Sequence, residues 1–189
     1  MVTGIAPGAF DDSANEKKYG IESVTFPENV KTPYTAAQKT RADELTERGD
    51  FVICSNAFAG NSLTMLKLPE GIIRIGEKAF EGNQLVSVAV PKTVWWIDSR
   101  AFASNEITAV DLPQSSDFRM SIGAESFAGN KIRAVQLPDR IERVELDAFK
   151  DNTGMEEVDP SAPGEWKNSG IVYMYAAPGT ESQVYIGHL

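Results

Sequence analysis

Residues 57–69 read AFAGNSLTMLKLP, and the pattern returns as AFEGNQLVSVAVP at 79–91, AFASNEITAVDLP at 101–113, SFAGNKIRAVQLP at 126–138 and AFKDNTGMEEVDP at 148–160. Phe stands second in each unit, Asn fifth and Pro last, so three residue types keep one register. Successive Phe residues are 22, 22, 25 and 22 positions apart. A fixed period of this length indicates a solenoid in which each unit forms one coil.

A sixth copy starts at Ala9-Phe10 and is completed, after six extra residues, by apolar positions that end at Pro27. Within each unit, the motif apolar-x-x-apolar-x-apolar predicts a short strand reached through a turn, because its later part alternates between inward and outward positions. The closing Pro ends that strand because it has no amide donor. Between units a second apolar pair recurs, as at Ile72 and Ile75. No single unit can bury its own apolar face, so neighbouring coils must supply the rest of the core.

The unit AF-x-G-N-x-L-x-x-V-x-LP, followed by V-x-x-I-G, resembles the BspA-like leucine-rich repeat of bacterial cell-surface proteins over about residues 1–160. This resemblance implies a solenoid of the leucine-rich-repeat type, with short β-strands stacked into a curved sheet, turns and single helical turns. It also implies a larger secreted or wall-attached protein that takes part in adhesion, with no catalytic residues to carry over. The last unit departs from the pattern, since Gly154-Met155 replaces one apolar residue and Asp159-Pro160 replaces Leu-Pro.

The predicted solenoid domain spans residues 1–160 and carries one insertion at about 28–50. Phe10 and Phe58 are 48 residues apart, which is 26 more than one period. Within the insertion, Thr35–Gln38 matches a capping box and is followed by a run of good helix formers, so we expect a helix there.

The two ends of the chain differ from the repeats. Residues 161–189 are predicted to form a C-terminal cap, with strands at 171–175 and 184–186 pairing as a hairpin. At the other end, Val2 and Ile5 occupy the second apolar pair of a unit, so the array starts without a polar cap. We therefore expect the chain to be a monomeric fragment of a larger protein.

Composition narrows the class of partner. The formal net charge is −9, with 27 acidic against 18 basic residues, and the basic residues form no stripe. Nucleic acid and anionic membrane surfaces are therefore disfavoured as partners. No apolar run approaches the roughly 18–20 residues of a membrane helix, and no signal peptide is recognisable. The single cysteine, Cys54, leaves the compartment open; an extracellular or cell-surface location is implied by the resemblance alone.

The most unusual local feature is the pair Trp95-Trp96, which stands where the preceding unit has Ile73-Arg74. Exposed paired aromatics favour contact with a protein or with sugar rings. The alternative is that both rings pack against the neighbouring coil, and the sequence leaves both interpretations open.

A second candidate surface consists of the outward positions of the predicted strands. Their side chains are mostly small, so this face is expected to be smooth, and concave sheets of solenoids are common binding surfaces. The alternative is a face that is only solvated. The positions that we single out are Met65, Lys67, Ser87, Asp111 and Gln136, with Ala89, Ala109 and Ala134 between them.

Chemistry-bearing motifs are missing from the sequence. Cys54 and His188 are the only residues of their types, and no phosphate loop or serine-triad signature occurs. We therefore predict no catalytic residue, no cofactor and no metal ligand.

One partial match to a calcium loop occurs in the first unit. Glu16 stands where the sharp turn of such a loop needs Gly, so a solvated insertion is the better interpretation. The positions that match are Asp11, Ser13, Asn15 and Glu22.

The sequence thus predicts a non-catalytic binding or adhesion module of a bacterial surface protein that recognises a protein or a glycan. The alternative is a structural spacer that presents neighbouring domains of a larger surface protein.

Overall fold

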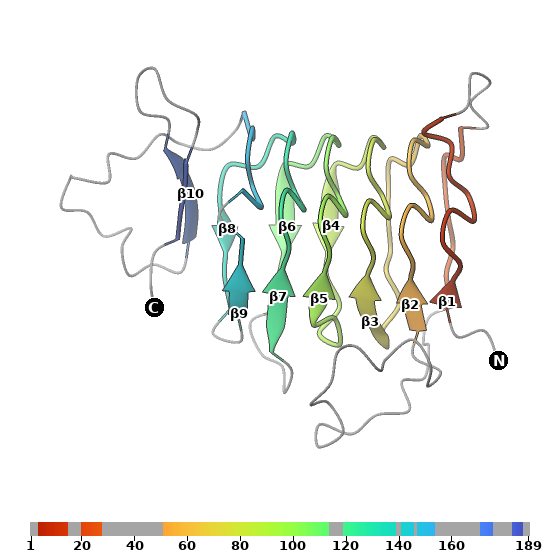
Figure 1. Ribbon diagram of the computed structural model, residues 1–189, viewed down its shortest axis with the longest axis horizontal. Helices are drawn as coiled ribbons and strands as arrows, with labels where there is room; N and C mark the ends of the chain where they lie inside the picture. The colour runs from red at the N-terminus through yellow and green to blue at the C-terminus, as the bar shows by residue number, and fades with distance from the viewer. Residues whose placement is uncertain are drawn as a thin grey trace.

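The computed structural model describes residues 4–14, 20–27, 51–113, 119–138, 141–145, 147–153, 171–175 and 183–186. Within these residues the regular elements are short β-strands, and successive coils lie side by side as a solenoid (Figure 1). The predicted fold class, a leucine-rich-repeat-type solenoid, is thereby confirmed. The expected helix at about 28–50 lies outside the described residues.

The longest sheet has six parallel strands, and each coil adds one strand to it. The second apolar pair of each unit forms these strands, because its two apolar residues point into the core, as the fully buried Ile72 and Ile75 do in β3. The strands run in the order β1 (Gly4–Ile5), β2 (Phe51–Ile53), β3 (Ile72–Ile75), β5 (Trp96–Ile97), β7 (Met120–Ile122) and β9 (Ile141–Val144).

The strands expected from the leucine motif are present in part. β4 (Ser87–Ala89) and β6 (Ala109–Asp111) pair in parallel, and β8 (Val135–Gln136) occupies the matching place one coil further on. The corresponding residues 65–67 of the preceding unit are not in a strand. The leucine motif therefore supplies the smaller sheet, and the main sheet lies in the segment between the motifs, to which the sequence analysis assigned no strand.

The core of the solenoid is a continuous stack of phenylalanine rings. Five buried Phe residues, one per coil, continue a stack that begins with the half-exposed ring of Phe10. Neighbouring ring centroids are 5.1 to 5.4 Å apart and the rings are within 15° of parallel. Since Phe10 stacks on Phe58 and Phe102 on Phe127, neither the long insertion nor the 25-residue unit interrupts the stack.

A ladder of buried Asn side chains ties the coils together beside the rings. Asn105 is typical: its Oδ1 accepts the Leu85 amide at 3.1 Å, and its Nδ2 donates to the carbonyls of Phe80 at 2.9 Å and Phe102 at 3.1 Å. One side chain thus satisfies backbone groups of two coils, which a buried turn requires. The same bridging between two coils is made by Asn61, Asn83, Asn105, Asn130 and Asn152.

The turn that leads into four of the stacked Phe residues holds a residue in the left-handed region. Its φ lies between 52° and 57° although the residue is not glycine. After the Phe, Gly60 is required for close approach, since a Cβ there would lie 2.4 Å from the backbone of Ser13 in the preceding coil. The left-handed residues before the Phe are Asn56, Lys78, Arg100 and Glu125.

The last described elements are β10 (Ile171–Tyr175) and β11 (Gln183–Ile186), which pair antiparallel. β10 also pairs antiparallel with β8, so β8, β10 and β11 form a three-stranded sheet that is separate from the pair β4 and β6 (Figure 1). The assignment of residues 161–189 as a cap stays a prediction.

Candidate functional site

One row of side chains runs across the outward face of the six-stranded sheet. The Cα partners along this row are Val52, Arg74, Trp96, Ser121 and Arg143, one from each of β2, β3, β5, β7 and β9. The strand neighbours that follow the first four of them are buried isoleucines, so the row itself points away from the core. Four of its five members are at least partly exposed.

Trp96 is the exposed aromatic residue of this row, with an exposed fraction of 39%. The guanidinium carbon of Arg74 lies 5.6 Å from the centroid of the Trp96 ring, which is a cation–π distance. Arg74 is held in turn by Asp98, whose Oδ2 is 2.8 Å from the arginine Nε and which is itself buried. Arg74, on the neighbouring strand β3, therefore helps to hold the orientation of the Trp96 ring.

Trp95 behaves differently from its neighbour. It is only partly exposed and packs, together with Cys54, against the buried Val52 and Ile73 in a small cluster separate from the main core. Burial raises the pKa of the Cys54 thiol, and the positive charge of Arg74 opposes this with a smaller effect. A thiol with a raised pKa is a poor nucleophile at neutral pH.

The outward positions of the leucine motif form a second surface. Ser87 lies on β4 and Asp111 on β6, next to the Cα partners Ala109 and Ala89 respectively, and all four are exposed. The large apolar groups near them are Met65, with an exposed fraction of 77%, and Val86, with 50%. Lys67 and Gln136 are also exposed.

The predicted site residues therefore belong to two surfaces. Trp95 and Trp96 lie at the six-stranded sheet, and the others lie along the leucine motif, where β4, β6 and β8 form a separate row of arrows in Figure 1. Both sheets pack their inward side chains into one core, as Val88 of β4 and Ile97 of β5 do.

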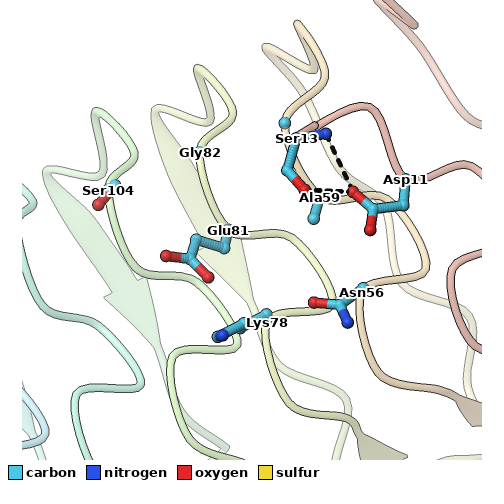
Figure 2. A pocket seen from close by; sticks show the side chains of 9 residues that line it. Asp11, Ser13, Asn56, Ala59, Lys78, Glu81, Gly82 and Ser104 are labelled. Atoms are coloured by element: carbon cyan, nitrogen blue, oxygen red, sulfur yellow. Dashed lines mark hydrogen bonds between the residues drawn. The ribbon is translucent and has the colours of Figure 1, made fainter. Parts of the chain in front are cut away.

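A groove that the sequence analysis missed lies on the turn side of the solenoid (Figure 2). Its volume is about 560 Å³. Four successive coils contribute to the groove, so no local sequence motif predicts it. Most of its lining residues nevertheless occupy fixed places in the repeat, two positions before or one or two positions after the Phe. It is lined by Asp11, Ser13, Asn56, Ala59, Gly60, Lys78, Glu81, Gly82 and Ser104.

Both carboxylates of the groove are already engaged. Asp11 Oδ1 accepts hydrogen bonds from the Ser13 amide at 2.9 Å and from the Ser13 hydroxyl at 2.6 Å, as the dashed lines in Figure 2 show. Glu81 accepts from Nε and Nη2 of Arg100, which also donates from Nη1 to Glu125. The hydrogen bond to Glu81 is the main cause that raises the pKa of Arg100. Glu81 is thus held in an ion-pair bridge that spans three coils.

The described part of the chain contains no group of three or more His, Cys, Asp or Glu residues placed to hold a metal ion. In the same residues no helix has the length and apolarity to cross a membrane. His188 and Asn15 lie outside the described residues, so the interpretations that involve them stay predictions.

Comparison with protein families and with known proteins gives one match. The model of the BspA type leucine rich repeat region (6 copies) matches residues 51–162. No curated protein and no solved structure matches the chain. The coil around Phe10 lies before the matched range but continues the same stack of rings. The resemblance in the repeat units is therefore confirmed, and the chain belongs to the family of BspA-type leucine-rich repeat proteins.

Proposed function

We propose that this chain is a non-catalytic binding or adhesion module of a bacterial surface protein and that it recognises a protein or a glycan partner. Repeat solenoids of this family are typical interaction modules, which supports binding in general. The observation that supports a particular site is the presentation of Trp96. Its ring is exposed on a sheet and its orientation is held by Arg74 and Asp98.

The physical advantage of this arrangement is preorganisation. Tryptophan and arginine are the side chains that most often dominate binding energy at interfaces. A ring already held in one orientation loses little conformational freedom when a partner binds, so more of the contact energy appears as affinity. Trp95, by contrast, packs in the outer cluster with Val52 and Ile73.

The face formed along β4 and β6 is the second candidate contact. Met65 and Val86 are exposed next to the small side chains of Ser87, Ala89 and Ala109. A smooth face with a few apolar groups suits a flat protein surface better than a single sugar ring. We place the module outside the cell because the bacterial cell-surface family implies that location.

A spacer is the alternative function, and the ladders of the core favour it. The Phe stack and the Asn hydrogen bonds make every coil continuous with the next, so the solenoid is suited to hold neighbouring domains apart. A spacer needs no surface that binds anything.

The purified chain tested against immobilised host-matrix proteins and a glycan array separates these functions. Trp96→Ala and Met65→Ala are run beside the wild type, since each removes the largest exposed apolar group of one candidate surface. Loss of a ligand in Trp96→Ala places the contact on the six-stranded sheet, and loss in Met65→Ala places it on the leucine-motif face. A wild-type chain that retains no ligand from either panel favours the spacer.

A further inference from the structure

We propose that Trp96, Ser121 and Arg143 form a slot for one ring of a neutral saccharide, with Trp96 as its stacking wall. This inference rests on the proposed binding function and names the ligand class for the Trp96 surface.

The row geometry sets the width of the slot. Trp96, Ser121 and Arg143 are Cα partners on three neighbouring parallel strands. Adjacent strands are about 4.8 Å apart, so the backbones that carry Trp96 and Arg143 are separated by about 10 Å. One ring in contact with groups on both sides occupies about 7–8 Å, because carbon atoms pack about 3.5–4.0 Å apart. The slot therefore admits one ring and no second layer.

Ser121 provides the floor. It has the smallest side chain of the five in the row and stands between two long ones, so the space above it is expected to stay open. The side of the indole toward β3 is already covered by Arg74 at 5.6 Å. The remaining access to the ring is thus on the side of Ser121, where the serine hydroxyl is available to a ligand hydroxyl.

The charges beside the slot select a neutral ligand. Arg74 pairs with Asp98, and Nη2 of Arg143 lies 2.5 Å from Oε1 of Glu145. Each guanidinium thus has its own carboxylate, and the whole chain carries a net charge of −9, which disfavours an acidic ligand. A guanidinium has five N–H donors, so donors remain for ligand hydroxyls after the carboxylate is bound.

The surroundings of Trp96 favour a sugar over a protein surface. The other exposed large apolar residues of the described chain are Phe10, Met65 and Val86, and none belongs to this row. A protein interface usually covers about 800 Å² on each partner around a cluster of apolar anchors. A single indole bordered by ion pairs and a hydroxyl lacks that cluster, but it offers a ring face and hydrogen-bonding groups to one sugar.

The test uses a glycan array with neutral oligomers of glucose, galactose, mannose and N-acetylglucosamine, and with sialylated and sulfated oligosaccharides. We expect the wild type to retain one or more neutral oligomers and no acidic one preferentially. A retained oligomer is then titrated into labelled protein while the three indole N–H resonances are followed by NMR. The Trp96 resonance should shift more than those of Trp95 and Trp166.

Three variants test whether the sugar ring binds between Trp96 and Arg143. Trp96→Ala and Ser121→Ile should each weaken binding about tenfold or more, the first by removing the wall and the second by filling the floor. Ile is favoured in strands, and Ser121→Ile leaves the core face of β7 untouched. Arg143→Ala, at an exposed site, should weaken binding several-fold. Ser23→Ile, the same change at an exposed position of the first coil, serves as the matched control and should bind as the wild type does.

Each other outcome overturns the slot. Retention of no neutral oligomer, preference for acidic ones, or full affinity in folded Ser121→Ile and Arg143→Ala contradicts it. If a matrix protein binds in a Trp96-dependent manner while no saccharide does, the slot is wrong and the proposed binding function stands. A chain that retains neither class counts against both.

Discussion

Phe102 and Trp96 lie six residues apart in the chain, one in an inward column of the solenoid and one in an outward row. The column that contains Phe102 has the same residue in all six coils, with rings 5.1 to 5.4 Å apart. The row that contains Trp96 changes at every strand, from Val52 to Arg143. Ring stacking requires the same residue at this inward position of every coil, whereas the residues at the outward positions can differ from coil to coil. Stability should therefore depend on the column and recognition on the row.

The largest expected effect is on the column itself. Phe102→Ala removes a fully buried ring between two stacked neighbours and should lower the free energy of unfolding by about 3–5 kcal/mol. Denaturant unfolding followed by circular dichroism measures this. Phe10→Ala is the matched control, because that ring has one stacking neighbour among the other column rings and is 48% exposed. Equal losses in the two variants would mean that the stack does not carry the stability.

The Asn ladder should give the next largest effect. Asn105→Ala leaves the Leu85 amide and the carbonyls of Phe80 and Phe102 without the partner that the side chain supplies. Each of the two carbonyls keeps a hydrogen bond from another Asn of the ladder, so only the Leu85 amide is left unpaired. One buried unpaired group costs about 1–3 kcal/mol, and the variant should lose stability in that range. Asn105→Asp keeps the acceptor and removes the two N–H donors, so it separates their contributions. A thermal midpoint unchanged in both variants would show that water replaces the side chain at no cost.

A smaller effect of opposite sign is expected at the left-handed turns. Lys78 has a φ of 55°, where a residue with a side chain is strained and glycine is not. Lys78→Gly should therefore stabilise the protein by about 0.5–1 kcal/mol, after the greater freedom of glycine in the unfolded chain is taken into account.

Lys67→Gly is the control for that change, since Lys67 is exposed and is not among the left-handed residues. There the same substitution should destabilise by about 0.5–1 kcal/mol. Chemical denaturation of both variants measures whether each substitution raises or lowers the free energy of unfolding. The same sign in both would show that the turn strain at Lys78 is negligible.

The part of the structure that the sequence alone predicted best is the set of inward columns. The common register of Phe and Asn predicted a solenoid with one coil per unit, because buried stacked positions admit few residue types. The pair Ile72 and Ile75 did not reveal the main sheet, since two apolar residues three apart are compatible with a turn or a strand. The alternation expected at the leucine motif was right for Ser87–Ala89, but the equivalent residues 65–67 are not in a strand.

The candidate surfaces depended on contacts between coils, which a single sequence does not display. Trp95 and Trp96 are adjacent, yet one packs on Val52 and Ile73 and the other is exposed. That difference follows from the parallel pairing of β3 with β5, which places Trp96 beside Arg74. The groove of Figure 2 combines residues from Asp11 to Ser104, so only the aligned register of the units points to it.

The measurement that tests the division between column and row most directly is paired unfolding and binding of Trp96→Ala. The free energy of unfolding should stay within about 0.5 kcal/mol of the wild type, because the ring packs on the surface and not in the core. Affinity for any ligand retained by the wild type should fall about tenfold or more, with partial recovery in Trp96→Phe. A variant that loses stability and keeps its affinity would contradict this division, since Trp96 would then act as a packing residue.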